Sequence, residues 1–118
     1  MKRALLLVDI QNDFLPGGAL AVPSGDEVVA VANQLMASVD LVVATQDWHP
    51  PDHGSFVTSH PGKELYEIVD LGGLPQVLWP VHCVAETAGA EFSDELDKER
   101  IDRVFHKGTS PDIDSYSG

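Results

Sequence analysis

The sequence of 118 residues is poor in cysteine, in basic residues and in long apolar runs. Its single cysteine, Cys83, excludes an intrachain disulfide and fits a reducing compartment. Only 7 Lys and Arg stand against 19 Asp and Glu, and the net charge of −12 would repel nucleic acid and anionic membranes. No run approaches the ~20 apolar residues of a membrane helix, and the apolar stretch after Met1–Arg3 is too short for a signal peptide. We therefore expect a cytoplasmic protein without nucleic-acid or membrane partners.

Two short apolar runs separated by a helical pattern indicate a βαβ unit. Residues Ala4–Val8 and Leu41–Thr45 are typical of parallel strands that are buried on both faces. Between them, apolar residues at helical spacing predict a helix that runs to about Ala37, with Ser24 as its N-cap and Glu27 completing a capping box. Such a unit takes a right-handed connection.

The remaining segments predict an α/β domain. Residues 102–107 read as a third strand, 66–69 as a short strand and 92–100 as a short helix. We predict a single domain over residues 1–118, with a Rossmann-like three-layer α/β/α arrangement around a parallel sheet. Because three strands are few for this fold and the tail at 109–118 is polar, we expect an incomplete, N-terminal portion of a larger domain.

A loop region at 46–82, dense in Pro and Gly, contains four potential metal ligands: Asp47, His49, His53 and His82. Asp and His at positions i and i+2 of an extended segment project to the same side. A carboxylate oxygen with imidazole nitrogens suits zinc, iron or manganese. His60 and His106 fit this cluster less well, and we interpret them as a solvated loop residue and a strand-end residue.

Three charged residues stand at or near the ends of the predicted strands: Asp9, Asp47 and Lys107. Because ligands bind at the carboxyl ends of strands in open parallel sheets, these side chains are expected to face one cleft. A lysine lowers the pKa of a neighbouring thiol, and a carboxylate can accept the thiol proton. The combination therefore suits a cysteine nucleophile.

Six motifs follow one another along the chain: LVDIQNDF at 7–14, PGGAL at 16–20, TQDWHP at 45–50, HGSF at 53–56, WPVHCV at 79–84 and KG at 107–108. In this order they resemble the nicotinamidases, which are isochorismatase-like cysteine hydrolases. The resemblance covers nearly the whole chain. It implies hydrolysis of nicotinamide to nicotinate and ammonia, a step in NAD salvage, and hydrolysis of pyrazinamide as well.

The resemblance also implies catalytic and substrate-binding residues. Asp9 matches the general base and Lys107 the lysine of an Asp-Lys-Cys triad, in which a thiolate attacks the carboxamide carbon. Phe14 and Trp79 match residues that line the ring pocket, and an aromatic slot suits a planar pyridine. The source of the water that hydrolyses the thioester is left open.

By the same resemblance, Asp47, His49 and His82 match the ligands of one divalent metal ion that holds the pyridine nitrogen. Zinc is the first expectation, with iron or manganese as alternatives. His53 matches a position that supplies a ligand in some members only. Partners are expected to be the small-molecule substrate and either a second copy of the chain or a second segment of the same enzyme.

One element of the family pattern is missing, because the nucleophilic cysteine of the family lies downstream of the lysine motif. Cys83 belongs to the metal motif instead, and we interpret it as a small buried hydrophobic residue. The 118 residues alone are therefore expected to be inactive. Two alternatives stay open: another hydrolase of the superfamily, or a non-catalytic metal-binding fragment.

Overall fold

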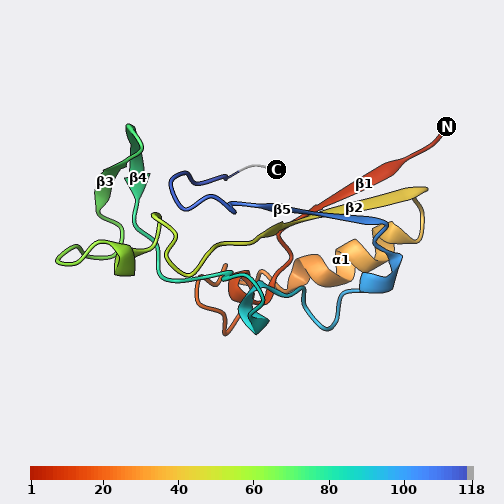
Figure 1. Cartoon of the computed structure of the whole chain (residues 1–118). Coiled ribbons are helices and arrows are strands. Elements are labelled where there is room, and N and C mark those ends of the chain that lie inside the picture. The colour runs from red at the N-terminus through yellow and green to blue at the C-terminus, as the bar shows by residue number, and fades with distance from the viewer. Residues whose placement is uncertain (117–118) are drawn as a thin grey trace.

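The computed structural model of the chain describes residues 1–116, which are built around a three-stranded parallel sheet of order β1-β2-β5 (Figure 1). β1, Ala4–Val8, pairs with β2, Leu41–Asp47, and β2 pairs with β5, Arg103–Lys107. The helix α1, Glu27–Met36, connects β1 to β2. The parallel pairing confirms the predicted α/β class and three of the predicted elements.

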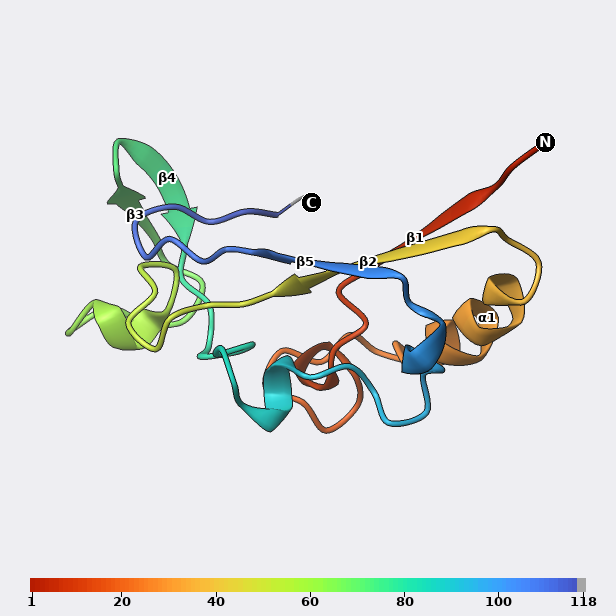
Figure 2. The ribbon, with the colours of Figure 1, turned by 45° about the vertical axis from the view of Figure 1, so that its right-hand side comes forward.

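A small antiparallel hairpin stands apart from the sheet (Figures 1 and 2). Its strands are β3, Ile68–Leu71, and β4, Leu74–Val77. They are joined by Gly72 and Gly73, whose φ angles of 60° and 88° suit a tight two-residue turn that other residues rarely adopt. The short strand predicted at 66–69 is present as β3, but it begins two residues later in the sequence than predicted.

The helix predicted at 92–100 is wrong, because that segment contains only a 3-10 turn at Lys98–Arg100. Phe92 and Leu96, which stand four residues apart as on one face of a helix, are both buried. The backbone around Phe92 pairs instead with residues 10–12, since the Asn12 amide donates to Glu91 and the Ser93 amide donates to Ile10. Long-range pairing has overridden the local pattern.

The predicted capping box is also wrong. The N-cap residue of α1 is Asp26, and its side chain makes no capping hydrogen bond. Ser24 has a φ of 57° and lies in the turn that precedes the helix, so its hydroxyl does not reach the first free amides. The predicted helix end agrees within one residue, since α1 ends at Met36.

The core lies between α1 and one face of the sheet (Figure 2), and it is formed by Leu7, Ile10, Val29, Ala32, Met36, Val42, Ala44, Phe92 and Leu96. On the other face, Leu6 and Val8 of β1 are 58% and 50% exposed. The prediction that both strands are buried on both faces is wrong for β1. Within residues 1–116 no helix covers that second face, so two of the three predicted layers are present.

The described part of the chain is elongated, with extents of 50 × 28 × 22 Å and a radius of gyration of 15.4 Å. A compact domain of this length has a radius of gyration of about 13.5 Å. In the same part, no helix combines the length and the apolar character needed to cross a membrane.

Candidate active site and metal centre

The carboxyl ends of the parallel strands bring Asp9, Asp47 and Lys107 together, as predicted. The Lys107 Nζ lies 2.9 Å from Asp9 Oδ2 and 2.6 Å from Asp47 Oδ1. It also donates to the backbone carbonyl of Ser115 at 2.8 Å, so all three ammonium protons have acceptors. One cation therefore joins the two carboxylates.

Asp9 is presented by an unusual backbone conformation. Its φ is 57°, a left-handed value that Asp tolerates better than most residues, and it turns the chain away from the sheet directly after β1. Thr45 Oγ1 donates to Asp9 Oδ1 at 2.8 Å, while Oδ2 faces Lys107. Both carboxylate oxygens are thereby oriented.

The charges of this group stabilise one another. Burial acts to raise the pKa of Asp47, but His49 and Lys107 outweigh it and hold that pKa below its usual value. Burial acts to lower the pKa of Lys107, but the Asp47 and Asp9 carboxylates outweigh it and hold that pKa above its usual value. At neutral pH Asp47 is therefore a carboxylate and Lys107 an ammonium ion.

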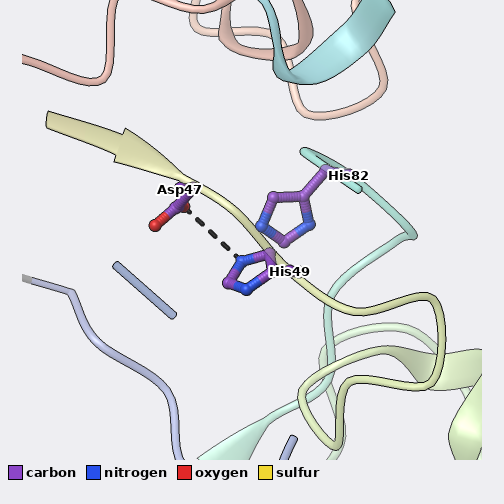
Figure 3. A group of neighbouring side chains, drawn as sticks. All are labelled: Asp47, His49 and His82. Atoms are coloured by element: carbon purple, nitrogen blue, oxygen red, sulfur yellow. Dashed lines mark ion pairs between the residues drawn. The ribbon is translucent and has the colours of Figure 1, made fainter. Parts of the chain in front are cut away.

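Beyond Lys107, the second oxygen of Asp47 faces two histidines (Figure 3). The ligand atoms of Asp47, His49 and His82 all lie within 4.8 Å of one another. Asp47 Oδ2 lies 3.6 Å from His49 Nε2, near the roughly 3.3 Å that separates two ligands of a tetrahedral zinc ion. This is the same set that the sequence predicted.

Both histidines are oriented by backbone carbonyls. His49 Nδ1 donates to the Gly108 carbonyl at 2.8 Å, and His82 Nδ1 donates to the Pro80 carbonyl at 2.7 Å. Burial lowers the pKa of His82, which favours the neutral imidazole that metals bind. For His49, burial acts to lower the pKa, but Asp47 and the Gly108 carbonyl raise it above its ordinary value.

The residues present fit a divalent ion. His49 Nε2 is buried and has no hydrogen-bond partner within residues 1–116. An unpaired buried nitrogen is costly in free energy, and it is rare in native proteins without an explanation. Nε2 lies 3.6 Å from Asp47 Oδ2, and in the neutral ring, with Nδ1 donating to the Gly108 carbonyl, Nε2 is free to bind a cation that would satisfy both atoms.

His53 does not join the Asp47–His49–His82 set. It packs against His49 with ring centroids 4.2 Å apart, and its ligand atom groups with those of His49 and Asp114. Its ring nitrogens contact the Ser55 hydroxyl at 2.7 Å and the Ile113 carbonyl at 3.1 Å. A ligand role for His53 stays a prediction.

His60 and His106, which we placed outside the metal cluster, make more side-chain contacts than a solvated loop residue and a strand-end residue would. His60 is partly buried and contacts the Gly54 carbonyl through Nε2 at 2.8 Å. His106 lies in β5, where its ring stacks on Trp48 at 4.2 Å and its Nε2 contacts Gln46 Oε1 at 3.0 Å. Neither reaches the ligand set.

A cavity of about 210 Å³ opens beside this centre, lined by Asp9, Phe14, Leu20, Asp47, Trp79, His82, Lys107, Asp114, Ser115 and Tyr116. It contains both aromatic residues expected at a ring pocket, Phe14 and Trp79. Tyr116 was not anticipated from the sequence; its hydroxyl accepts hydrogen bonds from Trp79 Nε1 at 3.3 Å and Gln76 Nε2 at 3.0 Å. Tyr116 lies in a polar tail without a periodic pattern, so nothing in the sequence marked it as a residue of this cavity.

Cys83 does not line this cavity. It is fully buried, and burial raises the pKa of its thiol far above the ordinary value. Its φ of 49° turns the backbone so that the Cys83 amide donates to Asp13 Oδ2 at 2.7 Å. A thiol that stays protonated is a poor nucleophile, in agreement with the structural role predicted for Cys83.

Residues 3–112 match the isochorismatase domain family. The chain belongs to this family. It is 54% identical to the nicotinamidase of Escherichia coli (strain K12), over 98% of this chain and 55% of that protein. The chain thus spans about half the length of this relative.

Solved structures give the same assignment. A nicotinamidase pyrazinamidase of Acinetobacter baumanii superimposes with a TM-score of 0.92 at 46% identity, over 97% of this chain and 55% of that one. A pyrazinamidase of Pyrococcus horikoshii in complex with zinc superimposes with a TM-score of 0.71 at 39% identity, over 96% and 55%. The predicted family is confirmed.

Proposed function

We propose that these residues form the base, lysine and metal portion of an amidase that hydrolyses nicotinamide, and also pyrazinamide, to the acid and ammonia. The observation that carries the proposal is the bridge of Lys107 between Asp9 and Asp47, next to a cavity that holds Phe14 and Trp79. The names of the relatives and neighbours support this substrate class. The product acid would enter NAD salvage in the cytoplasm.

In this proposal the cavity orients a planar ring between aromatic side chains. A divalent ion held by Asp47, His49 and His82, zinc first among the candidates, supplies a Lewis-acid contact for the ring nitrogen when bound. The zinc complex of the Pyrococcus pyrazinamidase supports this choice. The carboxamide would then lie towards Asp9 and Lys107, which line the same cavity.

Asp9 would accept the proton of a thiol and return it to the departing ammonia. The Lys107 ammonium lies 2.9 Å from Asp9 Oδ2 and favours a neighbouring thiolate by its positive charge. Thr45 holds the Asp9 carboxylate in one orientation during both transfers. The reaction therefore needs a cysteine close to Asp9, and Cys83 is buried away from the cavity.

We propose that the nucleophile comes from a further segment of the same enzyme, which would complete the single hydrolase domain. That segment would lie against the exposed apolar surface of β1 and α1. A hollow of about 490 Å³ there is lined largely by apolar residues such as Leu6, Val28 and Val31. The share of the relatives' length that this chain leaves uncovered supports the idea.

Ammonia release from nicotinamide tests the proposal, measured with the full-length protein, by which we mean residues 1–118 together with the further segment proposed above. Wild-type protein should release ammonia, and Asp9→Asn should abolish release while leaving metal content unchanged. The carbamoyl amide and isochorismate substrates of other family branches should be much poorer. Metal binding without ammonia release from any of these substrates would favour a non-catalytic metal-binding protein instead.

A further inference from the structure

None of the catalytic, metal-binding or substrate-binding roles above involves Gln11, yet its side chain is fully buried. Its amide makes three hydrogen bonds to backbone groups. Gln11 Oε1 accepts from the Asp47 amide at 2.8 Å, while Nε2 donates to the Asp47 carbonyl and the Ala90 carbonyl, each at 2.8 Å. Burying a glutamine is costly unless it is satisfied in this way.

The position of these bonds follows from where β1 ends. β1 accompanies β2 only as far as Thr45, whose carbonyl accepts from the Asp9 amide at 3.2 Å. The left-handed turn at Asp9 then directs the chain away, and residues 10–12 pair with the segment around Phe92. β2 continues for two more residues to Asp47 and has lost its neighbouring strand on that side.

The Gln11 amide takes the place of the missing strand. A primary amide carries the same donor and acceptor as a peptide group, and Gln11 presents both to the backbone of Asp47. On the opposite side, β5 pairs Lys107 with Asp47. The peptide groups of the metal-ligand residue are thus fixed from two directions, which determines where its carboxylate points.

We propose that Gln11 is a positioning residue that sets metal affinity by holding the backbone of Asp47. The inference rests on the proposed metal role of Asp47 but concerns a residue that touches neither metal nor substrate. Mutation of a residue that orients a metal ligand typically lowers metal affinity about 10- to 100-fold. Gln11 differs from them in acting through the main chain of the ligand residue.

The test is a cobalt(II) titration of the full-length protein, with Gln11→Met compared to Gln46→Met. Methionine keeps much of the glutamine volume and removes the amide. Gln46 is a matched control, because it is also buried and also donates to the Ala90 carbonyl, at 3.1 Å, but makes no hydrogen bond to Asp47. Gln46→Met loses two side-chain contacts, to the Ala90 carbonyl and to the His106 ring, and Gln11→Met loses three, of which two are to Asp47.

Gln11→Met should weaken cobalt binding at least about tenfold and shift the visible absorption of the bound ion, whereas Gln46→Met should stay within about twofold with an unchanged spectrum. Wild-type affinity in Gln11→Met, or an equal loss in both variants, would overturn the proposal. Should Gln11→Met not fold, Gln11→Glu decides, because it keeps the acceptor for the Asp47 amide, loses both donations as a carboxylate and keeps at most one of them as a neutral acid. Its affinity should also fall, and wild-type affinity there would contradict the proposal.

If no ammonia is released while Gln11→Met still binds cobalt weakly, the proposed function fails and the positioning role stands. If ammonia is released normally and cobalt affinity does not change, the positioning role fails alone. The two proposals are therefore tested separately.

Discussion

Two regions of the molecule differ in how far their side chains find partners within the described residues. One is the rim at the carboxyl ends of the strands, and the other is the surface formed by β1 and α1. At the rim, the buried side chains of Gln11 and His53 and the partly buried side chain of Lys107 have partners within residues 1–116. On the other surface, apolar side chains such as Leu6 and Val31 are more than half exposed. The candidate metal ligands are thus preorganised by this segment, while the apolar surface of β1 and α1 is left open.

This difference indicates that metal binding and bond breaking are separable. The candidate metal ligands and the carbonyls that orient their rings all come from residues 1–116. The apolar surface is instead where an added strand or helix would bring in new chemistry. The predictions below test one region against the other, from the largest expected effect to the smallest.

Lys107→Met should have the largest effect, because it leaves the partly buried Asp9 and the buried Asp47 without their shared cation. Breaking a buried pair costs about 3–5 kcal/mol of unfolding free energy, measurable by urea denaturation of the full-length protein. The control is Lys98→Met, which removes a surface ion pair to Asp94 and should cost less than about 1 kcal/mol. Equal losses in the two variants would show that the rim is not specially dependent on this cation.

Val31→Glu tests whether the apolar surface is covered in the full-length protein. Burying an unpaired carboxylate there should lower the unfolding free energy by about 2–3 kcal/mol, whereas in the 118-residue polypeptide the change should stay within about 0.5 kcal/mol. Ala30→Glu, at an exposed position of α1 outside the hollow, is the control. If Val31→Glu leaves the unfolding free energy of both polypeptides unchanged, no segment covers this surface.

Gly108→Ala should affect the metal more than the fold. An added Cβ would lie 2.5 Å from His49 Cε1, so the ring must move away from the Gly108 carbonyl that orients it. We expect metal affinity to fall about tenfold, equivalent to about 1.4 kcal/mol, as read by competition with a chelator.

Gly62→Ala is the matched control for Gly108→Ala. Its φ of 86° carries the same kind of backbone strain as the 65° of Gly108, but no atom lies within 4 Å of the added Cβ. A similar loss of metal affinity in Gly62→Ala would show that backbone strain, and not displacement of His49, is responsible.

Cys83 should show the smallest effect. Because burial raises the pKa of its thiol, Cys83 stays protonated as the pH rises from 7 to 9, and iodoacetamide should not modify the folded protein in that range. Mass spectrometry reads the result, with urea-unfolded protein as the positive control. Modification of the folded protein that increases with pH would instead point to an accessible, reactive thiol.

The sequence predicted what depends on local pattern or on shared strand ends. Apolar runs located β1 and β2, and the segment at 102–107 was recognised as the strand β5. The charged residues at or near the carboxyl ends of these strands predicted the contact of Lys107 with Asp9 and Asp47. The family motifs identified Asp47, His49 and His82, which the fold brings together. These features depend on a strand pattern and on spacing within single segments.

What the sequence did not predict depends on pairing between distant segments. The backbone around Phe92 pairs with residues 10–12 instead of forming a helix, and Gln11 bonds to Asp47 across 36 positions. The hydroxyl of Tyr116 reaches Trp79 across 37 positions. No local periodicity records such contacts, because each depends on how the loops are placed by the whole fold.

The most direct test of the central claim is ammonia release from nicotinamide by the 118-residue polypeptide, with zinc supplied. The measurement is made alone and together with the part of the E. coli nicotinamidase that this chain does not cover. We predict zinc binding but no ammonia from the polypeptide alone, and ammonia release only when the two parts are combined. Sustained turnover by the 118 residues alone, abolished by Cys83→Ala, would contradict the account.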